Sequence, residues 1–507
     1  MLRKGLLILM SLVLIVGAFS GCGPDKTTSD NGEVTLKWLI PSSNYSLEDE
    51  AEVEALFNEK LAEVLPGIQL DLEKVSFSDY AQRYQLALAA KEDIDLIWSG
   101  YLISYVSEAT NGSFLALDDL LKEYGKDLYE EIPEWAWKQQ SLNGKIYSVP
   151  NMQQVATEGR AMFFKIDQGD KYMDREEMTS ILNANPTLTR EAWDAIGDYL
   201  GKLKENGEIQ KGVSTATVPS MLGMMRADAL VDNFVILRGE DKPKVWYKYE
   251  TSDMKLAFDV MAEWYKKGYI VEDIASLESQ SMYEFKEDGN VLWAHNYFKG
   301  TAEGQRNSGR EYVDAIGITT QGPYISMKAS DTSTAIVSYS KHPVEAMKLL
   351  DLLNTEKGSE LFKLLAYGIE GKHYTLDDAN RVVTIRDAKE EPLYMIYHWV
   401  IGNVFNGYEM ETDPEGWFEY LQTEVQGENV EVSPLLGFKP DITKLSTELA
   451  HIKAVEGEFY RGLCDGALAD HKKTYNEMMN KLKVAGLDKV KAELQSQVDA
   501  WYAKNNK

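Results

Sequence analysis

Aromatic side chains stand beside amide, histidine or carboxylate side chains at several points where a strand-like run opens into a loop. The chain contains 11 Trp, 28 Tyr and 15 Phe. A pyranose ring has an apolar C–H face and a rim of hydroxyl groups, so a stacked aromatic ring with planar hydrogen-bonding groups suits it. The candidate residues are Trp98, Tyr101, Trp293, Asn296, Tyr297, His398, Trp399, Asn403 and Asn406. For each one alone, core packing is an equally good interpretation, and the sugar hypothesis depends on their clustering at strand ends.

Motifs for catalysis or metal binding are missing from the sequence. It has no phosphate-binding loop ending in Gly-Lys-Ser/Thr, no His-Glu-x-x-His and no Gly-x-Ser-x-Gly. The six histidines are scattered, so a catalytic zinc is not expected. Asp167, Asp170 and Asp174 offer oxygen atoms for calcium, but the EF-hand spacing fails, and a solvated acidic surface is the preferred interpretation. We expect no catalytic residue, cofactor or bound metal.

The N-terminus has the layout of a signal peptide. Arg3 and Lys4 precede an apolar run over residues 5–19, and small residues lead to Cys22. The run is shorter than the roughly 20 residues that a transmembrane helix needs. The tetrapeptide Phe19-Ser-Gly-Cys22 resembles a bacterial lipobox, apart from Phe where Leu is usual. We therefore expect residues 1–21 to be a signal peptide and Cys22 to carry acyl chains that anchor the protein, since each buried methylene adds about 0.8 kcal/mol.

Composition limits the remaining possibilities. Residues 22–33 contain no large apolar side chain and are expected to form a flexible tether. The 507-residue chain is too long for one ordinary domain. Its net charge of −28 opposes nucleic acid binding. If Cys22 is acylated, Cys464 has no disulfide partner, and a small buried residue is its expected role. Trp135 and Trp137 are both expected to be structural, one packed and the other half exposed.

Strand-like and helical patterns alternate after the tether. Residues 34–40 (VTLKWLI) predict a strand, and a helix follows up to Pro66. Further strands are predicted at 68–75, 94–98, 145–150, 160–166, 289–297 and 335–339, and helices at 80–90, 254–268, 343–353, 358–366 and from about 441 onward. The alternation predicts a parallel α/β sheet, in which ligands bind beyond the carboxyl ends of the strands. Asn44, Tyr45, Trp98 and Tyr101 fall at such ends.

Several longer motifs run through the chain after the tether. General ones are residues 86–90 (LALAA) with 95–98 (DLIW), and 145–150 (KIYSVP). More specific ones are residues 338–343 (SYSKHP), 346–350 (AMKLL), 367–374 (YGIEGKHY) and 402–406 (GNVFN). Together these motifs resemble the Gram-positive extracellular solute-binding lipoproteins (family 1) of carbohydrate ABC transporters, in the subfamily with a C-terminal domain of unknown function.

The resemblance implies an α/β, two-lobed, type II periplasmic-binding-protein-like fold with a hinge and an interlobe ligand cleft. The first lobe would comprise residues 34–153 and 320–365, and the second residues 154–319 and 366–507, including a C-terminal helical extension. The chain would cross between lobes near Gln153, Thr320 and Ala366. The ligand-binding residues that the resemblance implies are Asn44, Tyr45, Trp98, Tyr101, Asn151, Gln153, Trp293, Asn296, Tyr297 and Tyr324. His398, Trp399 and Asn403 are added to these candidates because of their aromatic or polar side chains.

The preferred hypothesis is an extracellular, lipid-anchored receptor that captures an oligosaccharide or modified sugar and delivers it to the membrane subunits of an ABC permease. We expect it to be a monomer and not an enzyme. Alternatives are a binding protein for peptides or other small solutes, a secreted glycosidase with two carboxylates roughly 5 to 9.5 Å apart, and a receptor that reports a sugar to a membrane sensor.

Overall fold

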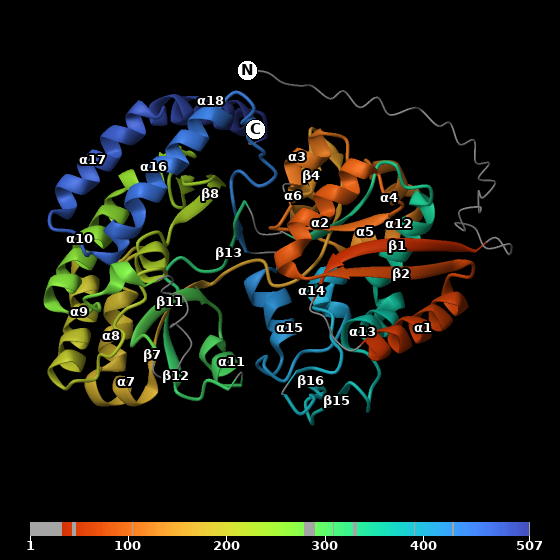
Figure 1. The fold of residues 1–507 in the computed structure, drawn as a ribbon, viewed down its shortest axis with the longest axis horizontal. Helices are drawn as coiled ribbons and strands as arrows, with labels where there is room; N and C mark the ends of the chain where they lie inside the picture. The colour runs from red at the N-terminus through yellow and green to blue at the C-terminus, as the bar shows by residue number, and fades with distance from the viewer. Residues whose placement is uncertain are drawn as a thin grey trace, which may run out of the picture.

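The computed structural model describes residues 33–42, 47–103, 105–277, 289–307, 309–327, 332–389, 391–427 and 430–505. The predicted signal peptide, Cys22, Asn44 and Tyr45 lie outside these ranges. The described chain forms two α/β lobes, drawn side by side in Figure 1 with connecting segments between them. The predicted fold class is confirmed. No helix within the described ranges is long and apolar enough to span a membrane.

The first lobe is built on a five-stranded sheet in the order β2-β1-β3-β14-β6. Strands β1, β2 and β3 are parallel, and β14 is antiparallel to β3. The strands are β1 (Val34–Pro41), β2 (Ile68–Val75), β3 (Leu96–Ser99), β6 (Val149–Pro150) and β14 (Ser333–Ile336), with a hairpin of β4 (Ser141–Leu142) and β5 (Lys145–Ile146) beside them. The predicted strand at residues 68–75 is therefore confirmed.

Helices surround this sheet (Figure 1). They are α1 (Leu47–Val64), α2 (Phe77–Ala90), α3 (Tyr105–Thr110), α4 (Asp118–Tyr124), α5 (Lys126–Glu131), α6 (Glu134–Gln139), α12 (Pro343–Leu353) and α13 (Ser359–Tyr367). Helix α2 begins where the Ser76 hydroxyl accepts a hydrogen bond from the Asp79 N–H, and it ends at Lys91 in the left-handed region. Helix α12 begins with Pro343 at a position that needs no N–H donor.

One apolar core joins two distant parts of the chain in the first lobe. Its buried residues run from Leu36 to Met152 and again from Ala335 to Ile401. The resemblance implies that residues 366–401 belong to the second lobe, but they pack in this core. Ala366 is fully buried there rather than at a crossing. A hairpin of β15 (Tyr374–Leu376) and β16 (Val382–Thr384) and helix α14 (His398–Ile401) belong to this stretch.

The second lobe contains two three-stranded sheets. One has the order β11-β7-β12 and the other β10-β9-β8. The strands are β7 (Gly159–Lys165), β8 (Ala227–Val231), β9 (Phe234–Leu237), β10 (Trp246–Tyr247), β11 (Leu292–Tyr297) and β12 (Val313–Ile318). Helices α7 (Ile166–Tyr172), α8 (Arg175–Leu182), α9 (Arg190–Glu205), α10 (Ser252–Lys267) and α11 (Thr301–Asn307) accompany them. Asp174 caps α8 by accepting a hydrogen bond from the Glu177 N–H, and Asp170 pairs with Arg175.

Three C-terminal helices complete the second lobe. They are α16 (Ser446–Asp465), α17 (His471–Val484) and α18 (Leu487–Asn505). Their apolar faces pack with Phe234, Tyr247 and Phe258 in one core that also contains Cys464. The expectation that Cys464 is a buried residue is confirmed. Of Trp135 and Trp137, one was expected to pack and the other to be half exposed, and the structure shows that Trp137 is the packed one and Trp135 the partly exposed one.

Three described stretches of the chain lie between the two lobe cores: residues 151–158, residues 319–327 with 332, and residues 411–427 with 430–434. The third crossing carries α15 (Trp417–Tyr420), and β17 (Glu431–Val432), which pairs with β13 (Tyr324–Ile325) of the second crossing. Residues of all three segments form a small apolar cluster that includes Ala156, Ile325 and Leu421.

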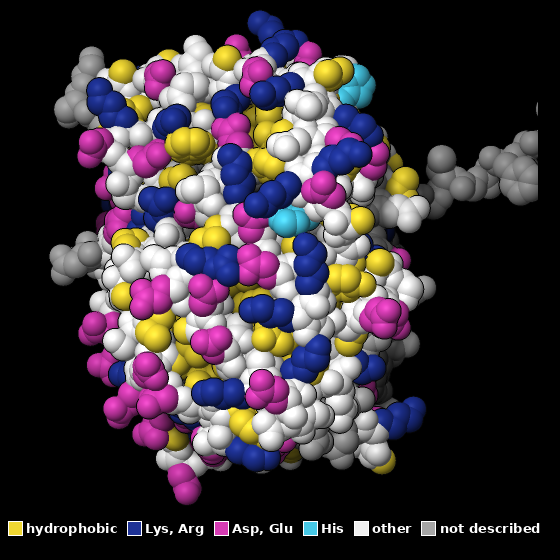
Figure 2. Space-filling model, turned by 90° about the vertical axis from the view of Figure 1, so that its left-hand side faces the viewer, with side chains coloured by type: hydrophobic (Ala, Val, Ile, Leu, Met, Phe, Trp, Pro, Cys, Tyr) yellow, Lys and Arg dark blue, Asp and Glu magenta, His cyan; other side chains and the backbone are white. Residues whose placement is uncertain are grey.

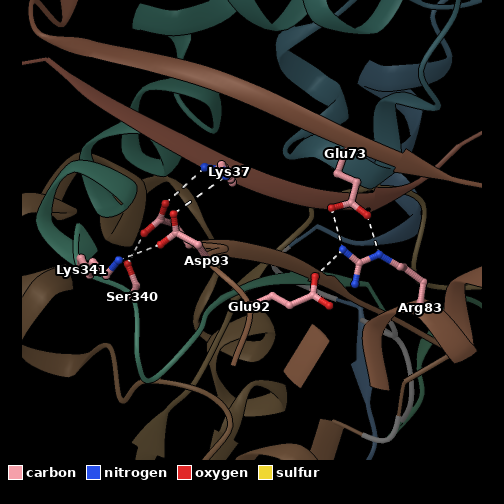
Figure 3. Close-up of polar contacts among 8 residues, drawn as sticks. Lys37, Glu73, Arg83, Glu92, Asp93, Ser340 and Lys341 are labelled. Atoms are coloured by element: carbon pink, nitrogen blue, oxygen red, sulfur yellow. Dashed lines mark hydrogen bonds and ion pairs between the residues drawn. The ribbon is translucent and has the colours of Figure 1, made fainter. Parts of the chain in front are cut away.

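Polar contacts hold the returning chain against the first sheet (Figure 3). Buried Asp95 accepts hydrogen bonds from the Lys37 N–H at 3.2 Å and from the Ser340 hydroxyl at 2.5 Å. Nearby, Asp93 pairs with Lys341 at 3.1 Å. These contacts join β1, the start of β3 and the segment after β14, which come from distant parts of the sequence.

We predict that Asp95→Ala lowers the free energy of unfolding by about 1–3 kcal/mol, because it leaves buried donors without an acceptor. The control Asp93→Ala removes a carboxylate that is 46% exposed, and should change that free energy by less than about 1 kcal/mol. Urea titrations of both variants measure the difference. Equal losses of unfolding free energy in the two variants would show that the buried hydrogen bonds of Asp95 do not stabilise the fold more than the exposed ion pair of Asp93.

Trp98 gives a second prediction. Its side chain is 0% exposed, and its ring lies 5.5 Å from that of Tyr80 in the first core. Trp98→Ala should therefore destabilise the protein by about 3–5 kcal/mol through the cavity it leaves. Thermal or urea unfolding without ligand checks this. Val484→Ala is the control, because the Val484 side chain on α17 is exposed. An unchanged unfolding midpoint would contradict a packing role for Trp98.

Candidate functional site

The ends of both sheets meet the first two crossings. In the first lobe, Ser99 ends β3 and lies opposite Ser333, which in turn pairs with Pro150 at the start of the first crossing. In the second lobe, Gly159 begins β7 directly after that crossing, and it pairs with Tyr297 at the end of β11. Residues that follow β3 and residues at these ends of β7 and β11 therefore lie on opposite sides of the crossings.

Five aromatic residues form a cluster on the first-lobe side, which we name the aromatic platform. Its members are Phe77, Trp98, Tyr101, Tyr397 and Trp399, with neighbouring ring centroids 5.7 to 6.0 Å apart. The structure thus brings together three residues that the sequence analysis selected separately. Trp98 forms the buried base, whereas Tyr101 is 63% exposed and stands edge-on to it. Tyr101 is the member that offers an open ring face.

Asn151 is a supporting residue of the platform. Its side chain is buried, and its amide N–H groups donate to the carbonyls of Trp399 and Val400 at 3.1 and 2.7 Å. Its side-chain oxygen accepts a hydrogen bond from the Thr334 hydroxyl at 3.3 Å. These contacts fix the backbone that carries Trp399 and use the hydrogen-bonding groups of Asn151 inside the protein.

Gln153 links the three crossings. Its side-chain amide donates to the Thr332 hydroxyl at 2.6 Å, and its carbonyl accepts from the Gln426 amide at 3.1 Å. The Gln426 oxygen in turn accepts from the Val155 N–H at 3.1 Å. The predicted crossing near Gln153 coincides with this junction, where the residue has a connecting role.

Two other candidates, Trp293 and Asn403, are buried in the protein, and a third, His398, is half-buried. Trp293 is fully buried and stacks on Phe163, with ring centroids 5.6 Å apart. Asn403 is buried, and its side chain accepts a hydrogen bond from the Phe405 N–H. Burial lowers the pKa of His398 to about 4, so its imidazole is neutral at pH 7. Their surroundings favour packing over ligand contact.

A pocket of about 280 Å³ opens on the second-lobe side, and we name it the arginine pocket. Arg160 at the start of β7 donates to the Asn296 side-chain oxygen at 2.8 Å. Gly159 permits the close approach of β12, because a Cβ there would lie 2.0 Å from the Ile318 oxygen. The other charged residues that line it are Glu158, Arg226, Asp228 and Arg238.

Tyr324 also lines the arginine pocket. Its hydroxyl donates to buried Asp228 at 2.8 Å, and the Arg238 guanidinium lies 4.5 Å above its ring. The pKa of Tyr324 is well above its usual value, first because of burial and then because of the Asp228 charge. Tyr324 is thus held as a neutral phenol whose donor is already used.

A second, wider hollow of about 650 Å³ adjoins the first and shares Glu158 with it. Tyr297 lines this hollow together with Lys299 and Tyr420, whose ring lies 5.2 Å from the Lys299 ammonium. Glu158 accepts a hydrogen bond from the Lys299 N–H at 2.5 Å. The two pockets form one polar surface with aromatic sides, suited to a ligand with many hydroxyl groups.

The sequence analysis missed the charged part of this surface. Glu158, Arg160, Arg226, Asp228 and Arg238 were not among its candidates. Arg160 could have been found, because it opens a strand directly after the predicted first crossing. Arg226, Asp228 and Arg238 are brought to the pocket by the β8–β9 hairpin and its flanks, which no sequence pattern connected to the crossing.

Comparison with known proteins places this geometry in context. The family model "Bacterial extracellular solute-binding protein" matches residues 46–360, and a domain of unknown function, DUF3502, matches residues 434–503. A carbohydrate ABC transporter substrate-binding protein of Streptococcus pneumoniae is 26% identical, over 98% of each chain.

Solved structures show the same fold. The N-glycan transport solute binding protein NgtS of S. pneumoniae is 23% identical, with a TM-score of 0.77 over 93% of this chain and 100% of the other. A human-milk-oligosaccharide (HMO) binding protein of Bifidobacterium longum infantis is 15% identical, with a TM-score of 0.62 over 93% and 99%. The two-lobed fold and the family match over more than half of the chain agree with the resemblance in the motifs. This chain belongs to the bacterial extracellular solute-binding protein family.

Proposed function

We propose that this protein captures an oligosaccharide between its two lobes outside the cell and delivers it to an ABC permease, without altering the sugar. The observation that carries the proposal is the placement of the aromatic platform and the two polar pockets on opposite sides of the crossings. Aromatic rings suit the C–H face of a sugar, and amide and charged groups suit its hydroxyls.

The relatives support a carbohydrate ligand. The S. pneumoniae relative with 26% identity is described as a carbohydrate transporter component. Structures of NgtS have been solved with Man1GlcNAc, at a TM-score of 0.69 to this chain, and with Man5GlcNAc, at 0.65. FusA of S. pneumoniae has been solved with kestose, at a TM-score of 0.58. An oligosaccharide rather than a peptide is therefore the ligand class to test first.

Closure of the lobes supplies the signal that the permease reads in this proposal. A ligand that contacts Tyr101 from one lobe and the arginine pocket from the other favours the closed state, because only that state offers both sets of contacts. The crossings joined through Gln153 and Gln426 would serve as the hinge.

We also propose that Cys22 is acylated after residues 1–21 are removed, and that the tether over residues 22–33 holds the lobes near the permease. The support is the sequence pattern around Cys22 together with membership of an extracellular family. A tethered receptor stays at high local concentration around its membrane partner.

We predict that Tyr101→Ala weakens oligosaccharide binding by more than about 1 kcal/mol, because it removes the exposed ring of the platform. Oligosaccharides and peptides are first screened by thermal unfolding of the purified protein, since a ligand of the folded state raises the midpoint. Calorimetry then measures affinity for the glycan that gives the largest shift.

Tyr129→Ala is the matched control. Tyr129 is 50% exposed and, like Tyr101, has its ring against a tryptophan, here Trp137, but it lies on α5, away from the crossings. The Tyr129→Ala substitution should leave the affinity for the oligosaccharide unchanged. Midpoint shifts with peptides alone would refute the carbohydrate ligand, and cleavage of the glycan on long incubation would refute a non-catalytic receptor.

For the anchor, we predict that Cys22→Ser abolishes incorporation of radiolabelled palmitate in a Gram-positive host, because the acylated thiol is lost. Wild-type protein should be labelled and sediment with membranes. The control Cys464→Ser should keep its label. Labelling that persists in Cys22→Ser would contradict acylation at this residue.

A further inference from the structure

The arginine pocket holds more cationic than anionic side chains. Three guanidinium groups, from Arg160, Arg226 and Arg238, line it together with the two carboxylates of Glu158 and Asp228. The whole chain has the opposite balance, with a net charge of −28. On the outer face of the second lobe, by contrast, basic and acidic side chains alternate closely (Figure 2). A local excess of positive charge at the ligand surface therefore requires an explanation.

Most of the charged groups in the pocket have protein partners. Arg238 pairs with Glu431 and also donates to the Gly322 carbonyl at 3.1 Å. Arg226 lies 3.4 Å from Asp253. The Asp228 carboxylate accepts hydrogen bonds from the Tyr324 hydroxyl and from the Met327 N–H.

Arg160 differs from the other two arginines. It forms no ion pair with any described residue, and its hydrogen bonds, to Asn296 and to the Gly159 carbonyl, both use Nη1. Its Nε–H is buried without a hydrogen-bond partner among the described residues, as is the Nε–H of Arg226. Nε and Nη2 form the side of a guanidinium that matches the two oxygens of a carboxylate. That side of Arg160 forms no hydrogen bond with the described part of the protein, and its Nε–H lies beneath the surface.

The surroundings of Arg160 add to its positive potential. The pKa of Arg160 is lowered by burial. The pKa of Lys248 is also lowered, mainly by burial, and the Arg160 charge acts in the same direction. His295 is exposed to solvent, but the protein around it still lowers its pKa, and Arg160 adds to that effect. The cations of Arg160 and Lys248 are thus held near one another, an arrangement that an anion would relieve.

We propose that the arginine pocket binds the carboxylate group of an acidic sugar residue within the captured oligosaccharide, with Arg160 as the residue that selects for it. The inference rests on the proposed function, whose ligand class it narrows. A volume of about 280 Å³ suits a single sugar ring, at the lower end of small-molecule pockets. The Asn296 contact fixes the guanidinium, so the Nε–Nη2 side, which has no protein hydrogen bond, is held in one orientation.

The test compares acidic sugars with neutral sugars of the same shape. Trigalacturonic acid is paired with its methyl ester, and 3′-sialyllactose with lactose. Calorimetry on the purified protein should give at least one acid that binds on the order of 10-fold more tightly than its neutral partner. The affinity of that acid should fall from low to high NaCl concentration, whereas the affinity of the neutral partner should stay nearly constant.

Variants then assign the effect to Arg160. Arg160→Gln should weaken binding of the acid by on the order of 10-fold and change binding of the neutral partner little. Arg160→Lys keeps the charge but loses the planar pair of donors, and should have an intermediate effect. Arg190→Gln is the control, since Arg190 on α9 pairs with Asp194 of the same helix and with Glu263 of α10, outside the pocket. Thermal unfolding without ligand verifies that each variant folds. If Arg160→Gln does not fold, the salt dependence of acid binding by the wild-type protein tests the carboxylate site instead.

The outcomes separate this inference from the proposed function. Equal affinity for acid and neutral partner, or absence of binding by both acids, overturns the carboxylate site. If neutral oligosaccharides still bind, the carbohydrate receptor stands. If peptides bind and no sugar does, the proposed function fails as well. Arg160-dependent binding of a sulfated disaccharide with no response to either carboxylate would also overturn the assignment to a carboxylate.

Discussion

The hydrogen bonds around Gln153 and Gln426 are the constraint on which the two-lobed arrangement depends. Three crossing segments, far apart in sequence, meet where Gln153 contacts Thr332 and where Gln426 contacts both Gln153 and Val155. Amide side chains suit this position because each has both a donor and an acceptor for backbone groups that no sheet or helix satisfies. Both the aromatic platform and the arginine pocket are positioned relative to this junction.

The discontinuous first lobe follows from the same connectivity. Its sheet is complete only when β14 returns from the second lobe and lies between β3 and β6. Asp95 and Ser340 link the two parts, and residues up to Ile401 fill the core. Bringing together segments so distant in sequence lowers the conformational entropy of the chain, and the contacts that offset this loss form only after the second lobe has formed or collapsed. The fold of one lobe is thus tied to the synthesis of the other.

The sequence predicted the elements well and the site only in part. Alternating patterns located β2 and α12, because hydrophobic periodicity and caps are local properties. The same periodicity could not reveal that residues 366–401 return to the first core, since the returning segment packs through scattered residues such as Tyr374, Val382 and Tyr394. Among the aromatic candidates, residue type alone did not distinguish buried Trp293 from exposed Tyr101, because solvent exposure depends on tertiary packing. The arginine pocket stayed hidden because its arginines come from separate elements.

Burial of Cys464 has a consequence for chemistry outside the cell. An unpaired thiol on the surface of an extracellular protein forms mixed disulfides, and the attacking species is the thiolate. In α16 the Cys464 thiol is enclosed by the second-lobe core, and burial raises its pKa to about 12. It therefore remains protonated and inaccessible at neutral pH. The three C-terminal helices thus make this thiol redox-inert, and the binding lobes keep a free cysteine in an oxidising environment without becoming cross-linked through it.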